Sequence, residues 1–249
     1  EDFSVPVDGG TITVSVRAAN GQIDLNSLVK NQLAQDKFAM QIERYDSSQR
    51  MFIRLLQLFP EIVHNQEEAV AILESVVDWA DSDDNPYGTG GAESNYYLGL
   101  ADPYLPANMG FRSVEELQMV RGITPELMRA LRPYITVVDS GGGLNVNAME
   151  PLLYRCINVK TDLKPLDEAA AAGLQPPQGQ PYKQMAEFET AVSKVISNPT
   201  DLDRDNLTVM TNYFWLQTQA DIGEQRRTSR SLLARGTPTF KVIRREEVY

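Results

Sequence analysis

The sequence has little of what most enzymes use for chemistry. Its 249 residues include one cysteine, Cys156, and one histidine, His64. A single cysteine excludes a disulfide within the chain and leaves the redox compartment undecided. The sequence contains no nucleophile elbow, no P-loop and no His-Glu-x-x-His motif. A Cys156–His64 pair stays open only because sequence does not show geometry. We therefore predict that the protein is not an enzyme.

Basic residues and long apolar runs are also scarce. The chain has 23 Lys and Arg against 34 Asp and Glu, a net charge of -11. Binding to phosphate backbones needs a Lys/Arg footprint, so we predict no nucleic-acid partner. No apolar run reaches the ~18 residues that a membrane helix needs, and no signal peptide is visible. The sequence opens on Glu1 rather than methionine, as a trimmed or processed chain does, and either kind of chain can lack an upstream anchor or targeting segment.

The periodicity of the remaining sequence predicts an α+β fold. Alternation of Ile12, Val14 and Val16 predicts a strand over residues 11–17, and a short strand is expected at 23–26. Residues 27–135 have mainly helical periodicity. The sequence of residues 144–148 resembles that of residues 23–26. We therefore predict that these two segments form neighbouring strands. A loop is expected at 165–182, a helix at 183–197, and an antiparallel meander over 208–218, 225–234 and 239–244.

Helix caps divide the helical block. Asn65 is placed to cap one helix, Ser113 and Glu116 form a capping box, and Thr124 precedes a proline at the first helical position. Residues 111–133 therefore form two short helices and resemble a helix-hairpin-helix. That motif binds DNA backbone in some proteins, but few basic residues lie around it in this sequence. A packing unit is the favoured interpretation.

The most informative segment is an acidic loop with aromatic neighbours. Asp81, Asp83 and Asn85 match the first three ligand positions of an EF-hand, but Pro86 replaces the turn glycine and Glu93 falls one place late. No lysine or arginine lies between residues 54 and 112. Packed carboxylates need a compensating charge, and a hard cation supplies it. A calcium site and a solvated acidic loop both fit these residues.

Five motifs lie in order along most of the chain. They are Asp78-Trp79-x-Asp81-x-Asp83-x-x-Pro86, Gly91-Ala92-Glu93-x-x-Tyr96-Tyr97, Ser113-x-Glu115-Glu116-Leu117 with Gly122-Ile123, Asn145-Val146-Asn147-Ala148, and a closing run of strands around Arg235. Together they resemble the K-type minor pseudopilins (GspK family) of the bacterial type II secretion system. In detail the chain is similar to the Pseudomonas member of that family.

The resemblance implies a pseudopilin-like antiparallel sheet with a helix, interrupted by a large inserted all-α domain that carries the helix-hairpin-helix-like segment. The implied parts are a pseudopilin body at 1–26, the inserted domain with its calcium loop at 27–140, and the rest of the body at 141–249. The resemblance also implies structural calcium near the acidic loop. Matching positions give a strong set of ligands and a weaker one: Asp81, Asp83, Glu93 and Asn95, then Asp78, Asp84 and Asp102.

The implied function is to cap the pseudopilus tip with the I- and J-type minor pseudopilins, to help initiate its assembly, and to contact secreted protein substrates. The implied location is the periplasm of a Gram-negative bacterium, with attachment to the inner membrane only through an N-terminal hydrophobic helix that this sequence lacks. Two alternatives remain at this point: a helix-hairpin-helix DNA-binding or uptake module, and a secreted hydrolase that uses scattered carboxylates. Salt-dependent duplex binding would favour the first. Activity lost with a carboxylate pair outside the acidic loop would favour the second.

Overall fold

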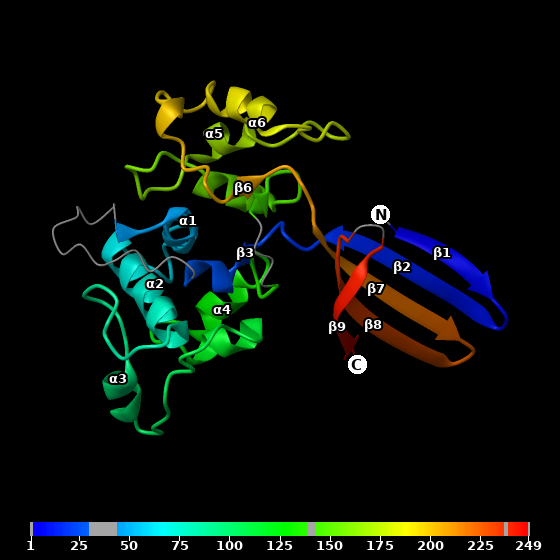
Figure 1. The fold of residues 1–249 in the computed structure, drawn as a ribbon, viewed down its shortest axis with the longest axis horizontal. Helices are drawn as coiled ribbons and strands as arrows, with labels where there is room; N and C mark the ends of the chain where they lie inside the picture. The colour runs from blue at the N-terminus through cyan, green and yellow to red at the C-terminus, as the bar shows by residue number, and fades with distance from the viewer. Residues whose placement is uncertain (1, 30–43, 139–142, 237–238, 249) are drawn as a thin grey trace.

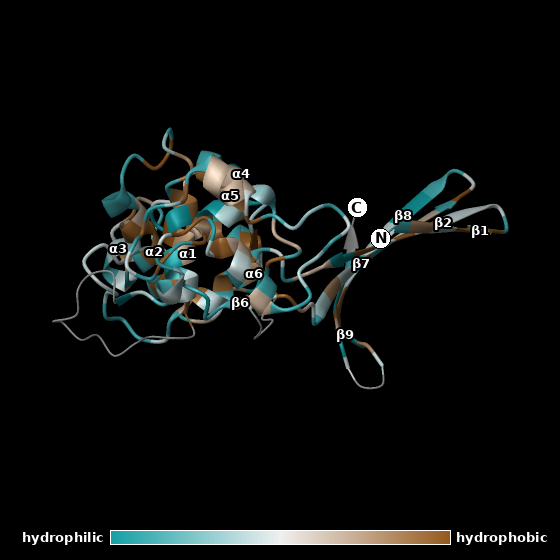
Figure 2. Cartoon of the chain, turned by 90° about the horizontal axis from the view of Figure 1, so that it is seen from above, coloured by the Kyte–Doolittle hydropathy of each residue, from teal (hydrophilic) through white to brown (hydrophobic). Residues whose placement is uncertain are grey.

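The computed structural model of the chain describes residues 2–29, 44–138, 143–236 and 239–248. A group of helices lies at one side, and a single twisted sheet projects from it at the other (Figures 1 and 2). Both ends of the chain lie at the sheet (Figure 1). Among the described residues, no helix is long and apolar enough to cross a membrane.

The sheet is antiparallel throughout and follows the order β1-β2-β7-β8-β9. Its strands are β1 (Asp2–Val7), β2 (Gly10–Ala18), β7 (Tyr213–Ile222), β8 (Gln225–Ala234) and β9 (Lys241–Val248). The alternating run at 11–17 and the closing meander are thus confirmed as strands. The predicted strand at 208–218 is divided into a two-residue β6 (Leu207–Thr208) and β7, and β1 was not predicted.

The helical part is built from six α-helices and four 3-10 helices in the described residues. The α-helices are α1 (Ser47–Leu56), α2 (Gln66–Ala80), α3 (Ser94–Leu98), α4 (Pro125–Leu131), α5 (Glu168–Ala172) and α6 (Met185–Val192). The 3-10 helices are η1 (Leu25–Leu28), η3 (Val114–Met119), η4 (Pro151–Cys156) and η5 (Pro199–Asp201).

The predicted helix caps are present. Asn65 Oδ1 accepts a hydrogen bond from the Glu68 amide at 2.8 Å, and Thr124 Oγ1 accepts one from the Leu127 amide at 3.1 Å. The carboxylate of Glu116 accepts from the Ser113 amide at 2.9 Å, as a capping box requires. These bonds satisfy amides that the first helical turn leaves unpaired, so local sequence fixes where the helices begin.

Two short parallel pairs correct the predicted strand pairing. β3 (Ile23–Asp24) pairs with β4 (Ile135–Thr136), and β5 (Leu144–Asn145) pairs with β6. The strand at 23 therefore pairs with 135, where the helical block ends, rather than with 144. The Asn145 amide still donates to the Asn20 carbonyl at 2.7 Å. The two segments thus lie near each other but do not form a strand ladder with one another.

One hydrophobic core runs from Ile23 to Leu202 and includes Phe188 of α6 together with residues of α1 and α2. A small separate cluster of Ala19, Val138, Trp215 and Leu232 lies where the sheet joins the helical part. The domain boundaries at 26/27 and 140/141 stay predictions.

A buried ion network joins α1 to the later part of the chain. Arg50 donates two hydrogen bonds to the Asp203 carboxylate at 2.7 and 2.8 Å, and Arg54 donates a third at 3.3 Å. Burial raises the pKa of Asp203, but the hydrogen bond and charge of Arg50 and the charge of Arg54 outweigh it and hold this pKa below its usual value. Arg54 also donates to the carbonyls of Cys156, Val159 and Asp162.

The region from 165 to 197 differs from its prediction in two places. The expected loop contains the short helix α5, which the Asp167 side chain caps by accepting from the Ala170 amide at 2.8 Å. An alanine run favours helix, and the surrounding prolines and glycines masked that signal. The helix expected over 183–197 is shorter in the structure, where α6 covers only Met185–Val192.

Candidate metal centre

The end of α2 and the start of α3 bring three carboxylates together. Asp78 lies in the last turn of α2, and Asp81 is the residue at which that helix ends, its amide still bonded to the Val77 carbonyl at 2.9 Å. Glu93 immediately precedes α3, and its carbonyl accepts from the Tyr96 amide at 2.8 Å. The acidic loop connects these two helix ends, so the fold returns Glu93 to the side of Asp78.

The geometry of these three residues fits a calcium ion. One carboxylate oxygen from each of Asp78, Asp81 and Glu93 lies within 4.8 Å of the others. Calcium–oxygen distances of about 2.3–2.6 Å allow two ligands of one ion to be at most about 5 Å apart. All three residues are buried. Asp78 Oδ2 and both Glu93 carboxylate oxygens have no hydrogen-bond partner among the described residues, which is the arrangement that a bound cation would complete.

The loop is shaped around Asp78. The Tyr87 amide donates to Asp78 Oδ1 at 2.7 Å. Gly91 passes so close to the other oxygen that an added Cβ would lie 2.1 Å from Asp78 Oδ2. Glu74, one turn earlier on α2, accepts from the Gly90 amide at 2.6 Å and from the Tyr45 hydroxyl at 2.8 Å. Two acids on one helix face therefore organise the loop, one anchoring its backbone and one facing the centre.

The three carboxylates repel one another. Burial is the main reason that the pKa of Asp78 is raised to about 7, and the charge of Asp81 adds to it. Burial followed by the charges of Asp78 and Asp81 raises the pKa of Glu93 to about 8. The guanidinium of Arg121 donates to the carbonyls of Gly90 and Gly91 at 3.4 and 3.3 Å rather than to these carboxylates. A divalent cation bound between the three carboxylates would offset this repulsion.

The other predicted ligands lie on the surface. Asp83, Asp84, Asn95 and Asp102 are exposed. Asp83 accepts from the amide of Asn85 at 2.9 Å, and Asp84 accepts from the Ser94 amide at 3.1 Å. The charges of Asp83 and Asp84 contribute to the raised pKa of Glu93. Asp81 and Glu93 of the strong set and Asp78 of the weaker set come together, and for the other four a role as ligand stays a prediction.

An aromatic cluster supports the centre, as the sequence predicts. Trp79 packs against Tyr97 and Tyr104 with ring centroids 5.4 and 6.2 Å apart. Tyr97 is completely buried, and its hydroxyl accepts from the Arg121 amide at 3.3 Å. Tyr96 contacts Tyr97 edge to face, with ring centroids 5.2 Å apart. These contacts fix both helix ends that carry the carboxylates.

The basic residues of the helix-hairpin-helix-like segment and the single cysteine are poorly placed for DNA binding and for catalysis. In residues 111–133, Arg129 pairs with Glu126 at 3.1 Å and Arg132 pairs with Glu115 at 2.7 Å, so these guanidinium groups already have acidic partners. Cys156 is fully buried, and burial raises the pKa of its thiol to about 12. A thiol with this pKa supplies almost no thiolate at neutral pH.

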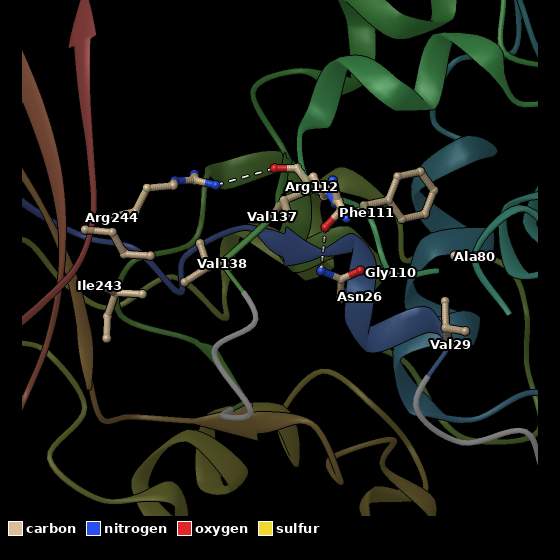
Figure 3. Close-up of a pocket in the computed structure, with 11 residues that line it drawn as sticks. Asn26, Val29, Ala80, Gly110, Phe111, Arg112, Val137, Val138, Ile243 and Arg244 are labelled. Atoms are coloured by element: carbon tan, nitrogen blue, oxygen red, sulfur yellow. Dashed lines mark hydrogen bonds between the residues drawn. The ribbon is translucent and has the colours of Figure 1, made fainter. Parts of the chain in front are cut away.

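A separate pocket lies between the helical part and the sheet (Figure 3). Its volume is about 660 Å³, and its lining is mostly apolar, including Phe111, Val138 and Leu232. Asn26 donates to the Phe111 carbonyl at 3.0 Å, and Arg244 of β9 donates to the Arg112 carbonyl at 3.4 Å across the pocket. These polar contacts link β9 and η1 to the loop before η3.

Comparison with known proteins identifies the family. Residues 21–140 match the family model described as type II secretion system (T2SS), protein K. Type II secretion system protein K of Aeromonas hydrophila is 30% identical over 98% of this chain and 73% of its own length. The protein of the same name from Pseudomonas aeruginosa is 27% identical over 92% of this chain and 62% of its own length. These identities do not single out the Pseudomonas member.

A solved structure shows the same fold. A chain of the crystal structure of the GspK-GspI-GspJ complex from enterotoxigenic Escherichia coli aligns with all of this chain and 84% of its own length. The TM-score is 0.76 at 20% sequence identity. The family consists of secretion pseudopilins and is not known for enzymatic activity. The chain belongs to the family of type II secretion system protein K, the K-type minor pseudopilins.

Proposed function

We propose that this chain is the periplasmic part of a minor pseudopilin that caps the tip of the type II pseudopilus in complex with I- and J-type minor pseudopilins. The observation that carries the proposal is the alignment of the whole chain, sheet and helical part together, with a chain of the GspK-GspI-GspJ complex. At the tip, this complex would help initiate the pseudopilus that exports folded proteins across the outer membrane.

The shape of the molecule supports a terminal position. The sheet carries both chain ends, while the helical part extends away from it (Figure 1). We propose that residues 27–140, with the helix-hairpin-helix-like segment, form an α-helical domain inserted into a pseudopilin body made of 1–26 and 141–249. A hydrophobic helix upstream of the sheet would anchor the full-length protein in the inner membrane. The bulk of the inserted domain would prevent another subunit from adding above it.

We also propose that calcium binds between Asp78, Asp81 and Glu93 as a structural ion. When bound, the ion would neutralise three buried carboxylates and hold the end of α2 against the start of α3. The support is the 4.8 Å clustering and the unpartnered oxygens of Asp78 and Glu93. A ligand that binds only the folded state stabilises it by mass action, so chelation should lower the melting temperature at matched ionic strength.

The test of the tip position uses full-length protein. The protein should co-purify with its I- and J-type partners, and a label on it should mark one end of each pseudopilus. A label on the subunit that forms the shaft should mark the whole length and serves as the control. Labels on this protein spread along the shaft would refute the proposal.

A further inference from the structure

The pocket between the helical part and the sheet has the composition of a ligand site (Figure 3). Its volume of about 660 Å³ lies within the range of small-molecule sites, roughly 300–1,000 Å³. Such sites combine apolar walls with a few polar groups, and they often form where two parts of a fold meet. Of the eleven described residues that line this pocket, two are arginine, one is asparagine and none is acidic. In a chain with a net charge of -11, this lining is an apolar wall with local positive charge.

An irregularity in β9 directs two neighbouring side chains to the pocket. Leu232 of β8 pairs with Arg244, and the next residue, Leu233, pairs with Val242, so the register skips Ile243. Consecutive side chains of a regular strand point to opposite faces of the sheet, yet Ile243 and Arg244 both line the pocket. Bulges of this kind re-aim side chains and are common next to functional sites. The bulge therefore supplies one apolar and one basic group to the same wall.

The apolar wall is only partly covered. Phe111, Val137 and Val138 are 3, 7 and 6% exposed, whereas Ile243 is 48% exposed. Moving the exposed part of Ile243 from water to an apolar environment is favourable. A ligand that fills the pocket therefore needs an apolar body.

The polar groups of the pocket are incompletely paired. The Arg112 side chain is exposed, and among the described residues its guanidinium forms no ion pair. Its amide, not its side chain, donates to the Glu116 carboxylate at 2.9 Å. Arg244 Nε lies 2.7 Å from Glu246 Oε1, but this buried atom and Asn26 Oδ1 have no hydrogen-bond partner of normal geometry in the described part of the chain. Guanidinium groups pair with carboxylates and phosphates, so the ligand needs an anionic head.

We propose that this pocket binds a single-chain amphipathic anion with a carboxylate or phosphate head. Its apolar chain lies against Phe111, Val138 and Ile243, and its head is bound by Arg112 and Arg244. The bound ligand connects β9 to the loop before η3, which the described residues join across the pocket through the 3.4 Å hydrogen bond from Arg244 to the Arg112 carbonyl. The site lies within this chain, so the inference does not depend on the proposed tip position or on other pseudopilins.

Calorimetry on this chain tests the proposal with decanoate and decyl phosphate, each kept below the concentration at which it forms micelles. Saturable binding of at least one of them is expected, and the tighter of the two identifies the head group. Decanol has the same tail without the charge and should bind at least about tenfold more weakly, because charge-assisted hydrogen bonds to the arginines are lost. Acetate and inorganic phosphate lack the tail and should not bind at the same concentrations.

Two variants with matched controls locate the site. Arg112→Ala should weaken binding at least about fivefold, and Ile243→Asp, which replaces an apolar contact with a like charge, at least about tenfold. Both side chains are exposed, so the fold should be retained, which circular dichroism checks. Arg129→Ala and Ile222→Asp alter an exposed arginine and an isoleucine that is also 48% exposed, both outside the pocket lining, and should leave binding unchanged.

Three results overturn the inference. The first is the absence of binding by both anions. The second is equal binding of decanol and of the tighter anion. The third is unchanged binding in either Arg112→Ala or Ile243→Asp. Because the titration uses this chain alone, each of these results leaves the proposed position at the pseudopilus tip intact.

Discussion

Replacing Asp78 by asparagine should make the metal-free protein more stable at alkaline pH. Asp78 is completely buried, and burial together with Asp81 raises its pKa from 3.8 to about 7. The folded state therefore holds this proton more tightly than the unfolded state. Stability that is present below about pH 4 is lost as the pH rises through about 7, because folding must then bury a negative charge.

The size of the effect follows from the shift. One pKa unit corresponds to about 1.4 kcal/mol, so the full shift corresponds to roughly 4 kcal/mol. Screening by solvent at the loop reduces the expected loss to roughly 2 to 4 kcal/mol. Asp78→Asn should recover most of it above pH 8 in chelator. In calcium the wild type should instead be more stable than Asp78→Asn, because the variant lacks one of the ligands.

The assay is urea unfolding between pH 5 and 9, in chelator and in calcium, followed by circular dichroism. The matched control is Asp8→Asn, which alters an exposed carboxylate in the turn between β1 and β2. It should leave the pH dependence of the free energy of unfolding unchanged in chelator and in calcium. A metal-free wild type whose free energy of unfolding does not fall between pH 5 and 8 would contradict a raised pKa at Asp78. So would an Asp78→Asn variant with the wild-type pH dependence.

Three other substitutions test the packing around this centre and the core. Gly91→Ala should weaken calcium binding at least about tenfold in calorimetry, because the added methyl group would lie 2.1 Å from Asp78 Oδ2. Asp203→Asn should cost about 3–5 kcal/mol in urea unfolding, because it leaves buried guanidinium groups without their counter-charge; Asp205→Asn, in an exposed ion pair, should cost less than about 1 kcal/mol. Thr124→Ala should cost about 1 kcal/mol by loss of the α4 cap, and a loss under about 0.3 kcal/mol would contradict that assignment.

Local sequence predicted much of the fold because local forces set it. Alternating residues specified β2, and side-chain caps specified the starts of α2 and α4. The pairing of β3 with β4 depends on contacts more than 100 residues apart, which periodicity cannot show. β1 was missed although Phe3, Val5 and Val7 alternate with other residues, because Pro6 argues against a strand anywhere except at a sheet edge, which is where β1 lies.

The candidate centre was predicted in part. Acid density and aromatic neighbours indicated the loop, and Asp81 and Glu93 were in the strong set. Asp78 was placed in the weaker set, although it is buried on α2 and lies within the carboxylate cluster. The role of Glu74 as an anchor was missed. Its signal was the spacing of four residues from Asp78, which places both carboxylates on one helix face.

Calcium titration by calorimetry on metal-stripped protein shows whether Asp78, Asp81 and Glu93 form a calcium site. We expect saturable binding to the wild-type protein that is lost, or weakened at least about tenfold, in both Asp81→Asn and Glu93→Gln. Absence of binding to the wild type, or unchanged binding in both variants, would contradict a calcium centre formed by Asp78, Asp81 and Glu93.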